Sequence, residues 1–172
     1  MHEALNNLKT RRSIRTYLPK QVEPELLEQV LEAGTYAPTG GGKQTPIIVA
    51  VQDPATVKQL SRMNARVLGN DSDPYYGAPT VLVVLAERTR RTYLLDGAAV
   101  MTTLVNAAHA VGLGSCWIHR AQEMFESEEG KALLEKWGIA GEYEGIGQVI
   151  LGYPSGPAPE PVPRKANYIV RV

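Results

Sequence analysis

Apolar residues recur along this 172-residue chain in two patterns that alternate with each other. Apolar positions three and four residues apart are typical of a helix that buries one face. This spacing predicts helices over residues 2–8, 24–33, 54–67, 93–111 and 124–137. Short runs that are apolar at nearly every position are typical of strands covered on both faces. Such runs predict strands over residues 47–51, 81–86, 115–118 and 146–153.

The predicted elements follow one another without an internal repeat or a low-complexity tract, which indicates one domain over residues 1–172. Pro24 and the pair Asp53–Pro54 mark helix starts, and Gly34 marks a helix end. A mixture of helices and strands of this kind favours an α/β or α+β fold, with helices around one central sheet.

Two segments indicate contact with a second copy of the chain. The predicted helix over 93–111 is apolar around most of its circumference, which one short chain can hardly enclose. The C-terminal arm, residues 154–172, begins with five prolines between 154 and 163 and should run extended. It ends in Tyr168–Val172, which has strong β propensity. We expect this end to reach a distant sheet edge, in its own chain or in another subunit.

The charge balance narrows the range of partners. Eighteen Lys and Arg residues balance eighteen Asp and Glu residues, so no overall field favours nucleic acid or an anionic membrane. Cys116 is the only cysteine, which excludes an intrachain disulfide and a cysteine-rich metal site. No signal peptide and no apolar stretch long enough to cross a bilayer is evident. We therefore expect a cytoplasmic protein without a metal, a nucleic-acid partner or a membrane partner.

The basic segment Arg11-Arg12-Ser13-Ile14-Arg15 is the strongest local signal for chemistry. Guanidinium groups bind phosphate bidentately, and a nearby serine hydroxyl can bind a further oxygen. In an extended segment, residues 11, 13 and 15 point to one face, while Arg12 faces elsewhere or reaches around. The alternative is a solvated basic patch at the end of the first helix. Arg164 and Lys165 form a second basic pair, which is either a surface pair or a further contact for the same anion.

A loop with three consecutive glycines, residues 40–42, follows the second predicted helix. Glycines let a backbone approach a flat ligand closely and leave amide groups free to donate. The loop is not a P-loop, because no strand directly precedes it and Lys43 is followed by Gln44 rather than Ser or Thr. The other interpretation is a mobile surface loop.

Candidates for acid–base catalysis are few. His109 falls inside the long apolar helix, where a hydrogen-bonded core residue is expected, whereas His119 follows a strand and is better placed to line a pocket. Neither a serine triad motif, a metal-ligand spacing nor a pair of carboxylates stands out. An enzyme of this kind would need a cofactor for its chemistry.

Four motifs in this order resemble the FMN-dependent nitroreductase family. They are Arg-Arg-Ser-Ile-Arg at residues 11–15, Ala-Pro-Thr through Gln44, Gly-Leu-Gly-Ser-Cys-Trp-Ile at 112–118, and Leu-Gly-Tyr-Pro…Pro-Arg-Lys at 151–165. Each motif is moderately specific, and together they span residues 9–165. The resemblance implies an α+β, three-layer fold with a central mixed sheet, in a domain-swapped homodimer that exchanges its C-terminal tails.

The resemblance also implies a function and a set of site residues. NAD(P)H would reduce tightly bound FMN, which passes electrons to an organic acceptor such as a nitroaromatic or a quinone by a ping-pong mechanism. No residue is assigned as an acid–base catalyst, and Arg15 is the candidate for stabilising charge on the ring. The implied cofactor-binding residues are Arg11, Arg12, Ser13, Arg15, Pro38, Thr39, Gly40, Gln44, Trp117, Ile118, His119, Gly152, Arg164 and Lys165.

The resemblance assigns these residues to different parts of the flavin. Arg11, Ser13 and Arg15 serve the phosphate, the ribityl chain and the pyrimidine edge of the ring, Arg12 can join them, and the loop from Pro38 to Gln44 comes from the other subunit. Trp117 to His119 cover the central edge of the ring, the backbone passes the flavin at Gly152, and Arg164 and Lys165 return to the phosphate.

One departure bears on the substrate. Many relatives have Asn in the glycine loop followed by Arg-Gln-Pro-Trp, whereas this chain has Gly42-Lys43-Gln44-Thr45-Pro46. The pocket wall that those side chains supply would therefore differ. Three alternatives remain: a flavin-binding carrier or sensor without turnover, a reductive dehalogenase or flavin-degrading relative on the same fold, and a cofactor-free α/β interaction domain.

Overall fold

Across residues 2–172, which a computed structural model describes, four strands form one sheet. The strands are β1 Pro46–Val51, β2 Thr80–Glu87, β3 Gly114–Ile118 and β4 Tyr143–Gly152, in the order β1-β2-β4-β3. Each lies where an apolar run predicted it. All three pairings are antiparallel, so the expectation of a mixed sheet is wrong for the strands of this chain. Parallel pairing is limited, in the described part of the chain, to one bridge between Ser13 and Ser115.

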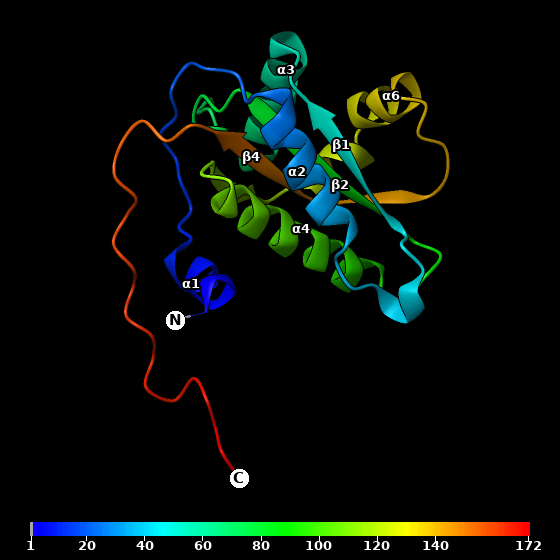
Figure 1. Cartoon of the computed structure of the whole chain (residues 1–172). Coiled ribbons are helices and arrows are strands. Elements are labelled where there is room, and N and C mark those ends of the chain that lie inside the picture. The colour runs from blue at the N-terminus through cyan, green and yellow to red at the C-terminus, as the bar shows by residue number, and fades with distance from the viewer. Residues whose placement is uncertain (1) are drawn as a thin grey trace.

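Helices cover both faces of this sheet and give three layers (Figure 1). The α-helices are α1 Glu3–Thr10, α2 Pro24–Thr35, α3 Pro54–Leu68, α4 Tyr93–Ala110, α5 Ala121–Glu126 and α6 Glu128–Lys136. One face packs against α2 and α4, and the other packs against α3, α5 and α6. The short helix α1 lies at the C-terminal end of α4. The α+β, three-layer architecture is thus as expected.

The acidic segment predicted as one helix over 124–137 is two helices, α5 and α6. The chain breaks at Ser127, whose extended backbone (φ −69°, ψ 158°) cannot continue α5. The Ser127 hydroxyl then accepts the N–H of Gly130 and begins α6. A Cβ on Gly130 would lie 2.1 Å from the carbonyl oxygen of Met124, so only glycine allows this close return.

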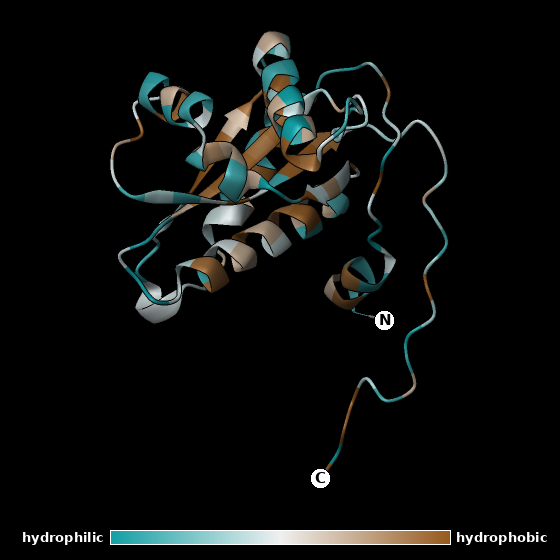
Figure 2. Ribbon diagram, turned by 180° about the vertical axis from the view of Figure 1, so that it is seen from behind, coloured by the Kyte–Doolittle hydropathy of each residue, from teal (hydrophilic) through white to brown (hydrophobic). Residues whose placement is uncertain are grey.

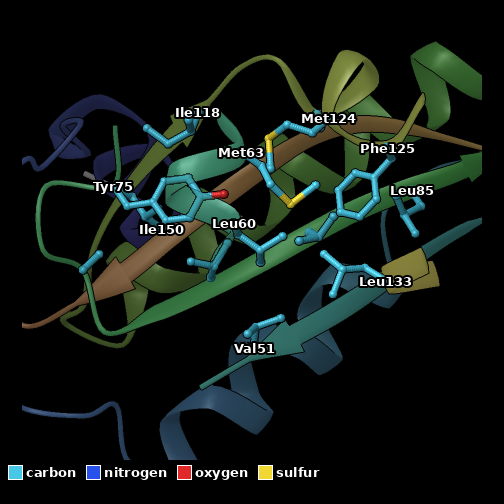
Figure 3. Close-up of a cluster of buried hydrophobic side chains, with 14 of the residues drawn as sticks. Val51, Leu60, Met63, Tyr75, Leu85, Ile118, Met124, Phe125, Leu133 and Ile150 are labelled. Atoms are coloured by element: carbon cyan, nitrogen blue, oxygen red, sulfur yellow. The ribbon is translucent and has the colours of Figure 1, made fainter. Parts of the chain in front are cut away.

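The alternation of side chains along β2 divides the core in two. Val81, Val83 and Leu85 face the layer of α3, α5 and α6, where they meet Leu60 and Phe125 (Figure 3). Leu82 and Val84 face the layer of α2 and α4. Because β2 is a central strand buried on both faces, it is apolar at nearly every position, whereas β4, also central, buries the polar Glu144 and Gln148 as well. Figure 2 shows the apolar centre of the sheet between helices with polar outer faces.

Leu104 anchors the layer of α2 and α4, and its truncation should destabilise the fold strongly. It is fully buried on α4, and a Cβ on Gly34 of α2 would lie 2.6 Å from its Cδ2 atom. We expect Leu104→Ala to lower the free energy of unfolding by about 2–5 kcal/mol, because the site is too tightly packed to collapse around the missing methyl groups. Urea denaturation measures this difference. The control Leu68→Ala, at the exposed end of α3, should change it by only about 0.5 kcal/mol, and equal losses would contradict this packing.

The C-terminal arm leaves β4 after Gly152 and runs outside the body of the chain (Figure 1). It forms no strand, and Tyr168, Ile169 and Val170 are exposed. The first turn of α4 also exposes Leu94 and Leu95. Within residues 2–172, no helix combines the length and the apolarity that crossing a membrane requires. Large apolar side chains therefore stand uncovered on both the arm and α4.

Candidate functional site

The two basic segments of the sequence line one groove. Its volume is about 930 Å³, and its walls include Arg11, Arg12, Ser13 and Arg15 from the α1–α2 connection and Arg164 from the C-terminal arm. These segments lie some 150 residues apart in sequence, yet the path of the arm beside α1 brings them together (Figure 1). The convergence makes the groove the candidate anion site.

Contacts with β3 and β4 hold the Arg11–Arg15 segment in place. Ser13 pairs with Ser115, and the Ile14 N–H donates to the Ser115 carbonyl oxygen at 2.9 Å. The buried Ile14 side chain packs against Gly114, where a Cβ would lie 3.0 Å from its Cγ2 atom. Tyr17 donates from its hydroxyl to the Ile14 carbonyl oxygen at 2.6 Å, and burial raises the pKa of that hydroxyl well above its usual range. Ile14 thus anchors the segment in the core, while Ser13 and Arg15 on either side of it line the groove.

The guanidinium groups in the groove differ in what they already bind. Arg12 donates to the carbonyl oxygens of Lys9 and Arg11 at 2.8 Å each and so caps the end of α1. Arg164 donates to the carbonyl oxygen of Val162. Those of Arg11 and Arg15 form no hydrogen bond or ion pair within residues 2–172, although Arg15 lies over the Tyr76 ring at 5.9 Å. Unneutralised guanidinium groups with the Ser13 hydroxyl are a donor set that fits a phosphate group.

The other predicted site residues, on or near β3 and β4 and on the arm, differ in how accessible they are to a ligand. Trp117 exposes part of its indole, and His119 is exposed. The Ile118 side chain lies in the core, so only its backbone is available to a ligand. The space above Gly152 is filled, because a Cβ there would lie 2.8 Å from Tyr17 and 2.9 Å from Pro79. Lys165 is not in the groove wall; its ammonium group lies over the Tyr168 ring at 5.3 Å.

The glycine loop is held by the first turn of α4. Gly40 donates its N–H to the carboxylate of Asp96 at 2.9 Å, and the Thr92 hydroxyl donates to the same carboxylate at 3.0 Å. A Cβ on Gly40 would lie 2.3 Å from the Thr92 hydroxyl oxygen, so this contact requires glycine. Further on, the Gln44 N–H donates to the Thr39 hydroxyl at 3.0 Å. The mobile-loop alternative is therefore not favoured at Gly40.

The glycine loop and the basic groove lie at opposite ends of α4 (Figure 1). Gly40 bonds Asp96 in the first turn, whereas Thr10, next to Arg11, bonds His109 in the last turn. Thirteen residues of helix at 1.5 Å per residue separate these two points by about 20 Å. One chain therefore does not bring Pro38, Thr39, Gly40 and Gln44 to Arg11.

His109 has a structural contact rather than a place in the groove. The Thr10 hydroxyl donates to the Asn6 carbonyl oxygen at 2.8 Å, so at 2.9 Å the Nε2–H of His109 donates to Thr10. Partial burial, and then the charges of Arg11 and Arg12, lower the pKa of the imidazole. The hydrogen bond joins α4 to α1 and supports the interpretation of His109 as a structural residue.

Asp96, Asn64 and Arg120 are polar residues of this region that the sequence motifs did not single out. Asp96 lies in an otherwise apolar helix, and Asn64 falls within the apolar face of α3. A polar residue at a buried helical position needs a partner, and that is the signal the sequence offers. The partner itself cannot be read from sequence, because Gly40 is 56 residues from Asp96.

Removal of the Asp96 carboxylate should release the glycine loop. We expect Asp96→Ala to raise amide hydrogen exchange over residues 39–44 and to lower the free energy of unfolding by about 1–3 kcal/mol, since the half-buried Gly40 and Thr92 donors lose their acceptor. Asp96→Asn keeps an acceptor oxygen and should preserve most of the protection. The matched control is Asp53→Ala, which removes a cap of α3 far from the loop in sequence. Unaltered exchange in Asp96→Ala would contradict the assignment.

Comparison with known proteins identifies the family. The sequence model of the Nitroreductase family matches residues 8–70 and 66–153. An Archaeoglobus fulgidus protein, provisionally named NADH dehydrogenase/NAD(P)H nitroreductase, is 32% identical over 162 residues, covering 90% of this chain and 87% of the relative. The chain therefore belongs to the nitroreductase family.

Solved structures agree with this family. The structure of a nitroreductase with bound FMN from Bacteroides fragilis superposes with a TM-score of 0.92 at 31% identity, over 100% of both chains. A nitroreductase with bound FMN from Desulfitobacterium hafniense shares the fold, with a TM-score of 0.89 at 23% identity over 100% of this chain and 99% of that chain.

Proposed function

We propose that this protein is an FMN-dependent oxidoreductase that passes electrons from NAD(P)H, through bound flavin, to an organic acceptor such as a nitroaromatic or a quinone. The observation that carries the proposal is the groove in which Arg11, Ser13, Arg15 and Arg164 converge from two ends of the chain. Basic residues outnumber the one acidic wall residue, Glu160, and the net positive charge suits the phosphate of FMN. The similar nitroreductase from Bacteroides fragilis, which has bound FMN, supports the choice of this phosphate ligand.

The residues of the groove would divide the work of holding the cofactor. Arg11, Ser13 and Arg164 would bind the phosphate, with Arg12 beside them. Lys165, the next residue of the arm, would add a further contact to the phosphate. Arg15 would stabilise negative charge at the pyrimidine edge of the ring, as fixed donors do where charge develops. Bound FMN would supply the redox chemistry, accepting hydride from NAD(P)H and passing electrons to the acceptor. Trp117 and the backbone at Ile118 and His119 would border the ring, and donor and acceptor would use its open face in turn.

A homodimer would complete this site. Since Pro38 to Gln44 lie about 20 Å along α4 from the groove, a partner subunit is the source from which they can reach it. The edge strand β1 has a free side next to a cavity of about 540 Å³, which Thr39 and Gln44 help to line. The extended arm with exposed Tyr168 to Val170 would cross to the partner and cover its apolar surface.

The visible spectrum of the purified protein is the first test of the proposed function. An absorbance pair typical of oxidised flavin, released on denaturation as FMN, is the expected result. A colourless protein that also fails to bind added FMN would refute the proposal. Steady-state oxidation of NAD(P)H with a quinone or a nitroaromatic then separates turnover from binding, and a yellow protein without turnover would favour a carrier or sensor.

A further inference from the structure

The chain adopts an unusual conformation immediately after β3. Arg120 has φ 75° and ψ 15°, the left-handed region that favours glycine. A residue with a Cβ pays about 1 kcal/mol or more for this conformation, so the surrounding structure must enforce it. The residue lies beside Trp117 and His119, the exposed end of β3. Strain of this kind next to a candidate binding surface requires a cause.

The cause is a buried polar network centred on Asn64 of α3. Arg120 donates from Nε to the Asn64 Oδ1 atom at 2.9 Å, and Asn64 donates from Nδ2 to the His119 carbonyl oxygen at 2.8 Å. The same amide donates to the Gln148 Oε1 atom at 3.0 Å, which also accepts the Tyr75 hydroxyl at 2.8 Å. Asn64 thus binds the residues on both sides of this peptide bond, the carbonyl group of His119 and the side chain of Arg120.

This network occupies the interior of the layer formed by α3 and α5. Asn64 and Gln148 are completely buried, and Tyr75 is 1% exposed. Figure 3 shows the Tyr75 hydroxyl pointing into the cluster that contains Met63 and Ile150. Polar groups in such a place lose their hydration, and apolar residues of similar size would fill the same space without that cost. The network therefore stabilises one particular conformation of the turn rather than the core as a whole.

The hydrogen bond from Asn64 to the His119 carbonyl oxygen fixes the direction of the Arg120 N–H. In a trans peptide the carbonyl oxygen and the following N–H point in opposite directions. Because the His119 carbonyl points inward to Asn64, the Arg120 N–H points away from the core. The structure gives this N–H no acceptor among residues 2–172. It lies two residues beyond the end of β3, the strand whose Ser115 pairs with Ser13 of the basic groove.

We propose that Asn64 and Arg120 are positioning residues: they hold the His119–Arg120 peptide so that the Arg120 N–H is a preset donor to the flavin ring. The inference rests on the proposed function, and it adds to that function a part of the α3 layer that no motif indicated. Neither side chain is required to touch the cofactor. Tyr75 and Gln148 support the network by satisfying the remaining polar atoms of its centre.

Two substitutions of Arg120 separate the effect of its left-handed backbone conformation from the effect of its side-chain bond to Asn64. Arg120→Ala keeps the conformational strain and loses the side-chain bond to Asn64, so only the bond from Asn64 to the His119 carbonyl oxygen remains to hold the peptide against that strain. Arg120→Gly also loses the side-chain bond, but glycine adopts the left-handed conformation without strain. We expect Arg120→Ala to weaken FMN binding by about three- to tenfold and to shift the midpoint potential of bound flavin, because one preset hydrogen bond is lost. Arg120→Gly should retain both values near those of the unmodified protein.

Asn64→Ala should reproduce the effect of Arg120→Ala, and it should do so in the apoprotein as well. There, amide hydrogen exchange at Met124, whose N–H donates to the Arg120 carbonyl oxygen at 3.2 Å, should rise in Asn64→Ala and Arg120→Ala but not in Arg62→Ala, an exposed control on α3. If Asn64→Ala fails to fold, the pair at position 120 still decides the matter.

Three outcomes would overturn the inference. They are unaltered affinity and potential in Arg120→Ala, equal damage from Gly and Ala at position 120, and unaltered exchange at Met124 in Asn64→Ala and Arg120→Ala. The first, in a yellow protein, would reject the inference while leaving the proposed function intact. Failure of the unmodified protein to bind FMN would instead reject the proposed function itself.

Discussion

Replacement of Arg15 by alanine is expected to weaken FMN binding by about 10- to 100-fold and to slow the reduction of the flavin that remains bound. Arg15 lines the basic groove, and its guanidinium group makes no hydrogen bond or ion pair within residues 2–172 that would compete with a ligand. A hydrogen bond from a charged donor contributes about 1.5–3 kcal/mol, which corresponds to this range of affinity. The loss of a fixed positive charge near the ring should also disfavour the reduced form.

Fluorescence titration with FMN and stopped-flow reduction by NAD(P)H measure the two effects of Arg15→Ala separately. Arg62→Ala is the matched control, since Arg62 is an exposed arginine on α3 outside the groove. Arg12→Ala should have a smaller effect on affinity than Arg15→Ala, because Arg12 already caps α1. Unchanged flavin content and reduction rate in Arg15→Ala would remove Arg15 from the site.

The order and the kind of the main elements could be predicted from the sequence. A helix buried on one face repeats its apolar residues every three to four positions, whereas a strand buried on both faces is apolar throughout. The runs at 47–51 and 81–86 are apolar throughout and became β1 and β2, which lie in a sheet covered on both faces. The break between α5 and α6 could not be predicted in this way. It depends on the approach of Gly130 to the Met124 backbone, a contact that leaves the helical spacing of apolar residues intact.

The candidate site was predictable in its parts but not in its assembly. Local chemistry identified Arg11 to Arg15 and Arg164, and the fold brings them into one groove. The glycine loop was also identified, yet it lies about 20 Å away along α4. Asn64 differed from its neighbours only as a polar residue on the apolar face of α3, and its partners could not be predicted because they come from β4 and from the turn after β3. Distances across the fold, and contacts between subunits, leave no period in the sequence.

Removal of the C-terminal arm after Pro163 is expected to abolish both dimerisation and FMN retention. The arm exposes Tyr168, Ile169 and Val170, each at least 67% exposed in the single chain. Burial of such side chains against a partner stabilises by about 1.5–3 kcal/mol each, enough to govern association. The same deletion takes Arg164 out of the groove, so it should weaken the phosphate site as well.

A shorter truncation after Asn167 separates these two consequences. It keeps Arg164 and Lys165 but removes the β-prone end, so it should impair dimerisation directly and FMN binding only through the loss of the partner's glycine loop. Sedimentation velocity gives the oligomeric state, and the flavin absorbance gives the cofactor content. Because the glycine loop and the groove lie at opposite ends of α4, weak binding of FMN by a monomer is the specific signature of a site shared between subunits. A stable, yellow dimer of the chain that ends at Pro163 would contradict both the exchange of tails and the place of Arg164 in the site.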